Sequence, residues 1–92
     1  MELSDELWAE VGFVIRSKNR AKVMKSLQGE VKIPSMIAVE TGIITNHVSN
    51  NLKDLKCHGL VECINPEAKK GRLYRLTDDG NKIVDKLDYF QV

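Results

Sequence analysis

Residues 33–61 read IPSMIAVETGIITNHVSNNLKDLKCHGLV, and this stretch predicts two helices separated by a short turn. Pro34 suits the first position of a helix, because the amide that proline lacks would be unpaired there in any case. Residues 36–38 (Met-Ile-Ala) would supply the apolar contacts of this helix. We expect it to stop at Thr41 and Gly42, with Gly42 in the left-handed conformation that glycine adopts at little cost.

A longer helix is predicted from Thr45, as its N-terminal cap, to about Lys56. A glycine-containing turn between two helices is typical of a helix-turn-helix. Gly59 would end the second helix. The apolar residues of the second helix follow a 4-4-3 spacing and are expected to face inward: Ile44, Val48, Leu52 and Leu55.

A hairpin follows directly, because residues 60–65 and 72–77 alternate as strands do. The loop between them carries Lys69, Lys70 and Arg72. A helix-turn-helix followed by a hairpin is the layout of a winged helix, whose wing here covers about 65–72. Basic residues on a wing reach phosphates or the minor groove and give affinity without sequence information. The alternative for this segment is a solvated hairpin loop, in which lysines are common.

The second helix, about 45–57, would then be the recognition helix, roughly 18 Å long and of a width that the major groove admits. Asn46, Asn50 and Lys53 are three or four residues apart and share one face. Asparagine pairs with adenine edges, and lysine reaches guanine or phosphate. Thr45 lies where amides at a helix start hold a phosphate. For His47, DNA contact and plain solvation are equally good interpretations. The predicted DNA-binding residues are Thr45, Asn46, His47, Ser49, Asn50, Lys53, Lys69, Lys70 and Arg72.

Further helices flank this unit on both sides. Ser4 and Ser17 are predicted to cap two helices within residues 4–28, an interpretation we favour over one bent helix, and Thr77 is predicted to cap a last helix. The expected fold is of the α+β class and mainly α: a winged helix-turn-helix with a three-helix core, a two-stranded β-hairpin wing and flanking N- and C-terminal helices. Aromatic residues near both ends exceed what so small a core needs, so a homodimer through the terminal helices is an open hypothesis: Trp8, Phe13, Tyr89 and Phe90.

Composition sets broad limits on the function. The chain has 92 residues, of which 42% are hydrophobic and 29% charged, so residues 1–92 are expected to form one domain. The net charge is only +1, yet residues 16–32 hold six basic residues and one acidic residue, which fits an anionic partner. No apolar run is long enough to span a membrane, and the acidic start lacks the basic region of a signal peptide. We therefore expect a cytoplasmic protein without a membrane partner.

The sequence offers no recognisable active site. No nucleophile-base set, carboxylate pair or phosphate-binding glycine loop is evident, so we predict neither an enzyme nor a cofactor. Cys57 and Cys63 are expected to be core residues. A zinc site combining them with His47 and His58 is the less favoured alternative, because the spacing matches no common ligand pattern.

The segments IAVETGIITNHVSNNLKDLKCHGLVE and NPEAKKGRLYRLTDDGNKIVDKL resemble archaeal winged-helix transcriptional regulators of the ArsR/MarR-like class. The resemblance covers roughly residues 16–88. It implies sequence-specific binding of double-stranded DNA, commonly by a homodimer. The cysteine motif of metal-sensing members has no counterpart here, and no small-molecule effector is evident. Neither the operator nor the direction of regulation follows from the sequence.

A different class of function competes with this one. Some winged helices serve as protein-protein interaction modules of transcription or other assemblies, and fold alone does not decide between the two uses. A protein-binding version should expose apolar or acidic residues along 45–56. The polar and basic residues found there favour DNA. A sequence-indifferent chromatin protein would be more basic than a net charge of +1.

Overall fold

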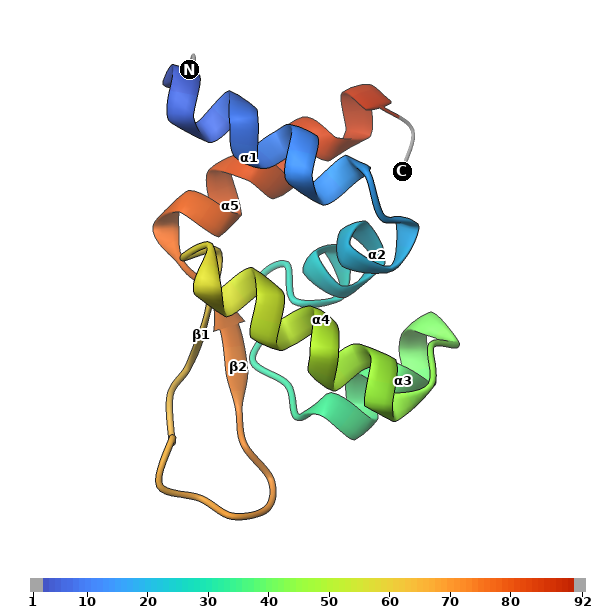
Figure 1. The fold of residues 1–92 in the computed structure, drawn as a ribbon. Helices are drawn as coiled ribbons and strands as arrows, with labels where there is room; N and C mark the ends of the chain where they lie inside the picture. The colour runs from blue at the N-terminus through green and yellow to red at the C-terminus, as the bar shows by residue number, and fades with distance from the viewer. Residues whose placement is uncertain (1–2, 91–92) are drawn as a thin grey trace.

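The computed structural model describes residues 3–90. The chain forms helices and a hairpin in the order expected of the sequence (Figure 1). The elements are α1 (Asp5–Ile15), α2 (Lys18–Ser26), α3 (Pro34–Thr41), α4 (Thr45–Cys57), β1 (Val61–Cys63), β2 (Tyr74–Leu76), α5 (Asp78–Leu87) and the short 3₁₀ helix η1 (Asp88–Phe90). Within the described residues, no helix combines the length and the hydropathy needed to cross a membrane.

Hydroxyl caps define the start of three helices, as predicted. The Leu7 amide donates to Ser4 Oγ (3.2 Å), the Arg20 amide to Ser17 Oγ (3.3 Å) and the Gly80 amide to Thr77 Oγ1 (3.0 Å). Each bond satisfies one of the amides that a helix start leaves without an intrahelical partner. The cap at Ser17 also breaks residues 4–28 into two helices.

The turn between α3 and α4 depends on Gly42. This residue has φ +74°, the left-handed conformation predicted for it, and its amide donates to the Ala38 carbonyl. Thr41 stabilises the same turn, because its hydroxyl donates to the Ile37 carbonyl (2.7 Å) and accepts from the Ile43 amide (3.3 Å). The chain therefore reverses within three residues and enters α4.

The start of α4 differs from the prediction. Thr45 is the first residue of the helix and not its cap; Ile44 occupies the cap position, and no side chain caps the helix. The Ile44 side chain is 67% exposed, so its assignment to the inward stripe is wrong. Its backbone is extended (φ −59°, ψ 138°), so it does not continue the helical face of Val48. Ile43, only 8% exposed, takes the place in the core instead.

One hydrophobic core joins all five α-helices and both strands. The other predicted inward residues of α4, Val48, Leu52 and Leu55, are buried in it, whereas Met36 of α3 is exposed, contrary to the prediction. Because α3 is a short helix on the surface, only Ile37 of its apolar run reaches the centre. The largest fully buried side chains are Met24, Leu27, Ile37, Leu52, Leu55, Leu60, Ile83, Leu87, Val11, Val14, Val23 and Val48.

The hairpin pairs fewer residues than expected. β1 and β2 are antiparallel with Val61 opposite Leu76, and the ladder covers three residues on each strand, not six. A single bridge from Lys32 to Tyr74 extends the sheet, with Lys32 N–H to Tyr74 O at 3.1 Å and the return bond at 2.9 Å. The segment before α3 is thereby tied to the outer edge of β2.

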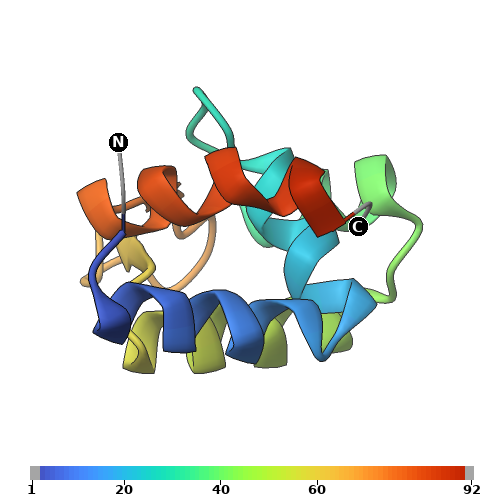
Figure 2. The same ribbon diagram turned by 90° about the horizontal axis from the view of Figure 1, so that it is seen from above.

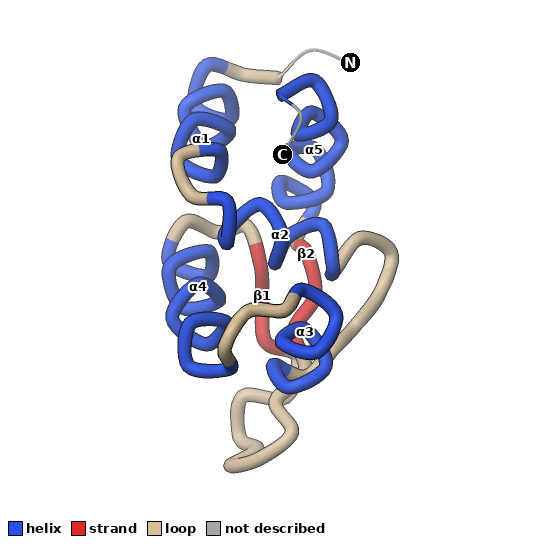
Figure 3. Tube along the Cα trace, turned by 90° about the vertical axis from the view of Figure 1, so that its right-hand side faces the viewer, coloured by secondary structure: helices blue, strands red, loops and turns tan. Residues whose placement is uncertain are grey.

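The terminal helices lie together at the end of the molecule opposite the hairpin loop. Figure 3 shows α1 and α5 side by side above α2, and Figure 2 shows them alongside one another from above. The α4 helix lies on the same side of the molecule as α1; it starts beside α3 and runs from there toward the terminal helices (Figure 1). The opposite end of the molecule is therefore formed by α3, α4 and the hairpin loop.

Candidate nucleic-acid interface

The outward face of α4 is polar along its length. Asn46, Ser49, Asn50 and Lys53 are all exposed, while Val48, Leu52 and Leu55 hold the opposite side of the helix in the core. Because residues three and four apart lie next to one another on a helix, Asn46, Asn50 and Lys53 form one continuous row. The helix thus presents amide and ammonium groups, which can hydrogen-bond to base edges and phosphates.

The hairpin loop, residues 64–73, is held by hydrogen bonds within the loop, two of which involve the Asn65 side chain. Asn65 Oδ1 accepts from the Leu73 amide (2.7 Å), and its Nδ2 donates to the Gly71 carbonyl (3.1 Å). The Ala68 amide donates to the Asn65 carbonyl (2.9 Å), and Arg72 Nε to the Ala68 carbonyl (2.8 Å). The loop therefore has a defined shape, which was not predicted from the sequence. The dipeptide Asn65-Pro66, a common turn starter, was the signal that could have indicated it.

A hollow of about 680 Å³ lies between α4 and this loop. We call it the basic groove. It brings together four of the predicted residues: Ser49 and Lys53 from α4, and Lys69 and Arg72 from the loop. The other lining residues, which the prediction missed, are Pro34, Lys56, Gly71 and Tyr74. The spacing of Ser49, Lys53 and Lys56 by four and three residues was the signal that could have identified Lys56.

The charge of the basic groove is uncompensated. Across the part of the chain that the structure describes, ion pairs join Lys25 to Asp88, Lys32 to Glu30 and Glu40, His58 to Glu10, and Arg75 to Glu62. None of them involves a lysine or arginine of the groove. Four cationic side chains around one hollow repel one another unless an anion lies between them. The groove is thus suited to a polyanion.

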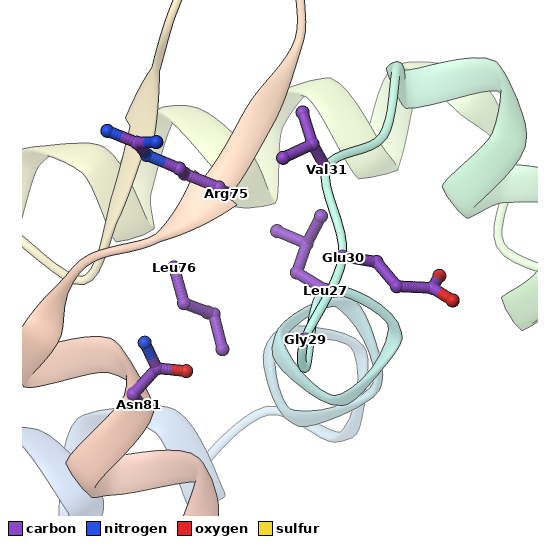
Figure 4. Close-up of a pocket in the computed structure, with 7 residues that line it drawn as sticks. All are labelled: Leu27, Gly29, Glu30, Val31, Arg75, Leu76 and Asn81. Atoms are coloured by element: carbon purple, nitrogen blue, oxygen red, sulfur yellow. The ribbon is translucent and has the colours of Figure 1, made fainter.

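A second hollow, of about 240 Å³, lies between the segment after α2, strand β2 and α5 (Figure 4). Leu27, Val31 and Leu76 make it largely apolar. Arg75 borders it, but its guanidinium points away, and Nε donates to Glu62 (3.0 Å). The Glu30 carboxylate also points away from the hollow and pairs with Lys32 (2.8 Å). Its charged groups do not converge on a ligand, so we place no binding site there.

Solved structures share this arrangement. The homodimeric winged helix-turn-helix DNA-binding domain of a possible ArsR-family transcriptional regulator from Mycobacterium bovis superposes with a TM-score of 0.73 at 24% identity, over 97% of this chain and 87% of that one. The fold is a winged helix-turn-helix. A MarR-family transcription regulator gives a TM-score of 0.74 at 19% identity, over 90% of this chain and 59% of its own. MepR of S. aureus in complex with DNA gives a TM-score of 0.71 at 17% identity, over 94% of this chain and 73% of that one.

These identities establish the shape of the winged helix-turn-helix and no more. No model of a protein family matches the sequence, and the comparison with curated proteins yields no match. The solved neighbours are regulators of the ArsR and MarR types, as the sequence resemblance implied. The archaeal part of that resemblance stays a prediction.

The remaining predicted residues lie outside the basic groove. Asn46 and Asn50 are exposed on α4 next to it, Thr45 is exposed at the helix start, and Lys70 is exposed on the wing. Because an α-helix turns about 100° per residue, His47 lies roughly 160° around α4 from Ser49, on the flank away from the groove.

The cysteines do not behave as predicted. Cys57 is exposed at the end of α4, and Cys63 is partly buried on β1, so neither is a fully buried core residue. Cys57 follows Lys53 by four residues and so shares its outward face. Among residues 3–90, no three histidine, cysteine or acidic side chains gather as metal ligands would.

Proposed function

We propose that residues 1–92 form a single DNA-binding domain of a transcriptional regulator that recognises specific sequences. In this proposal α4 lies in the major groove as the recognition helix, and the wing contacts the sugar-phosphate backbone or the minor groove. The observation that supports it most directly is the basic groove, in which Lys53 and Lys56 of α4 face Lys69 and Arg72 of the wing without a carboxylate partner. The neighbour that contains DNA, MepR, has the same fold.

Different residues would make different contributions. Lysine and arginine of the groove and wing displace counterions from phosphates, which gives affinity for every sequence. Asn46 and Asn50 can form paired hydrogen bonds with adenine, which favours particular base pairs. Thr45 and Ser49 have hydroxyls for bases or phosphates. The flank position of His47 favours plain solvation for that residue.

We further propose a homodimer formed through the terminal helices. Trp8 on α1 and Tyr89 and Phe90 on η1 leave large apolar surfaces in water. Burying them in a two-fold interface would place two recognition helices about 34 Å apart, opposite the half-sites of a pseudo-palindrome. Sedimentation tests this directly. A monomer at roughly 50 μM would overturn the dimer, because a dimer with a dissociation constant of about this concentration is already a weak one.

Binding to a random-sequence duplex, followed by fluorescence anisotropy across a salt series, tests the DNA interface. The double variant K53A/K56A should weaken binding. The slope of log affinity against log salt concentration should become shallower by about 0.9 for each phosphate that the protein no longer neutralises. The matched control K18A/K22A removes the same charge from α2, away from the groove, and should retain most of the affinity. Equal decreases in affinity for both variants would mean that the groove is not the interface.

An interaction module for proteins is the second candidate, and one observation favours it. Met36 and Val39 expose apolar side chains on α3, where a shallow and mostly apolar hollow is bordered by Ser35 and Glu40. Undetectable DNA binding even at low salt would favour this candidate and make Met36 and Val39 the first positions to vary.

A further inference from the structure

The exposed side chain of Ile44 has no evident role in folding. It stands at the cap position of α4 and is 67% exposed, whereas its neighbour Ile43 already fills the core position. Branched aliphatic residues are also among the poorest N-terminal caps. Ser4, Ser17 and Thr77 provide hydroxyl caps for α1, α2 and α5. At α3 and α4 an isoleucine occupies the cap position and no side chain caps the helix, but Ile33 is partly buried whereas Ile44 is exposed.

The location of Ile44 relates it to the proposed recognition helix. The first backbone bond of α4 runs from the Val48 amide to the Ile44 carbonyl (3.0 Å), so Ile44 lies directly before the first turn that contains Asn46. In helix-turn-helix proteins the N-terminal residues of the recognition helix contact base edges. The groove-lining residues Ser49, Lys53 and Lys56 come later in the helix. Ile44 thus projects from the end of α4 farthest along the helix from Lys56.

The chemistry of the major groove offers one apolar partner. Thymine alone among the four DNA bases presents a methyl group there, and aliphatic side chains contact it. An adenine read by Asn46 or Asn50 is paired with a thymine, so amide and aliphatic contacts would favour the same A·T-containing site. An isoleucine that is costly to expose in the free protein loses water on binding such a methyl group.

We propose that Ile44 is a specificity-determining residue that recognises the C5-methyl group of a thymine in each half-site. This inference rests on the proposed function and deepens it. It differs from the protein-docking role considered for Met36 and Val39, because it requires a partner that is DNA and a single group on that DNA.

Replacement of thymine by deoxyuridine tests the contact, since it removes only the methyl group and keeps the hydrogen-bonding edges. The operator is first selected from a random pool with the wild-type protein, and each thymine is then replaced in turn. Wild type should lose about fourfold in affinity at one thymine per half-site, corresponding to the ~0.8 kcal/mol that burial of one methyl group contributes. Ile44→Ala should bind the thymine operator more weakly and lose this discrimination.

Two further variants separate recognition from folding. Ile44→Ser places a hydroxyl cap on α4, so it should raise the midpoint of thermal unfolding while abolishing the preference for thymine over deoxyuridine. Val39→Ala, at an apolar position of α3 that is 84% exposed, is the matched control and should keep the wild-type preference.

The outcomes are distinct. A penalty for deoxyuridine that disappears with Ile44→Ala supports the proposal. If wild type tolerates deoxyuridine everywhere, or if Ile44→Ala retains the full penalty, the proposal is wrong, although salt-dependent binding to random duplex would still support the DNA-binding function. If wild type binds no DNA at low salt, both proposals are wrong.

Discussion

The imidazole of His58 stacks on the ring of Phe13, with the ring centroids 3.6 Å apart and the planes inclined by 10°. His58 follows the last residue of α4, and Phe13 belongs to α1. Both rings have a further partner: His58 Nδ1 lies 2.7 Å from Glu10, and the Arg20 guanidinium lies 3.9 Å from the centroid of the Phe13 ring. The C-terminal end of the proposed recognition helix is thus anchored to a terminal helix.

Truncation of Phe13 should release this anchor. We expect Phe13→Ala to lower the free energy of unfolding by about 2 kcal/mol, less than for a fully buried phenylalanine because the ring is only partly buried. His58→Ala should cost less, since the Arg20–Phe13 contact remains. Chemical denaturation of both variants measures these decreases. Lys82→Ala, an exposed change on α5, is a suitable control, and an effect of Phe13→Ala no larger than this control would contradict the anchoring role.

Gly80 permits the close approach of α5 to the segment before β1. A β-carbon at this position would lie 2.0 Å from the Leu60 carbonyl oxygen, and that oxygen accepts from the Thr77 amide (3.1 Å). Gly80→Ala should therefore destabilise the fold by roughly 1–3 kcal/mol, as overpacking does, because backbone has to move. The change in denaturation midpoint measures it.

Gly12 provides the matched comparison. It lies within α1, and a β-carbon there would meet nothing within 4 Å. Gly12→Ala should stabilise the protein by about 0.5–1 kcal/mol through helix propensity. Equal effects at the two glycines would show that the approach of α5 to Leu60 does not restrict position 80.

Lys32 is a nearly buried charge that two carboxylates neutralise. Its Nζ lies 2.8 Å from Glu30 and 2.5 Å from Glu40 and also donates to the Ser26 carbonyl. Burial lowers the pKa of Lys32, but the hydrogen bonds and charges of Glu30 and Glu40 together outweigh burial and raise the pKa above its ordinary 10.5. The resulting stabilisation is fully present below the ordinary pKa and is lost as the pH rises through the raised one.

The decrease in the free energy of unfolding at alkaline pH therefore includes a contribution from Lys32. In denaturation at pH 8 to 12 (roughly the span around the lysine pKa), wild type should lose this part of its stability, and Lys32→Met should lack the corresponding decrease. Lys82→Met, at an exposed position, corrects for the general effect of removing a lysine. Parallel pH profiles for wild type and Lys32→Met would show that the two carboxylates do not stabilise the charged lysine.

Asn65 is predicted to shape the wing without contributing charge. Asn65→Ala removes its side-chain bonds to the Leu73 amide and the Gly71 carbonyl. If the wing contacts DNA, affinity should fall several-fold because the loop then has to be ordered on binding, at a cost of about 1 kcal/mol per ordered residue. The salt dependence should stay the same, since no phosphate contact is removed. A salt series on wild type, Asn65→Ala and K69A/K70A separates shape from charge, and unchanged affinity in Asn65→Ala would contradict this role.

Much of the secondary structure could be predicted because its causes are local. The hydroxyls of Ser4, Ser17 and Thr77 bond to amides three residues away, so the sequence alone locates three helix starts. Gly42 marks the turn because its left-handed conformation is costly for other residues. The outward face of α4 could be predicted because residues three and four apart are neighbours on any helix. Asn46, Asn50 and Lys53 therefore lie together regardless of the tertiary structure.

The remaining features depend on residues that are distant in the chain. Ile44 and Met36 satisfy an apolar pattern, but Ile43 and Ile37 occupy the core, and only packing decides which of adjacent apolar residues is buried. Lys56 lines the basic groove because the wing lies opposite it. The spacing of apolar residues and the helix caps thus determined which helices form and which side of α4 faces water. The sequence also placed basic residues on a hairpin loop. Tertiary structure decided which cations face one another, which isoleucine stays exposed and which carboxylates pair with Lys32, because these depend on distances between segments that local propensity does not set.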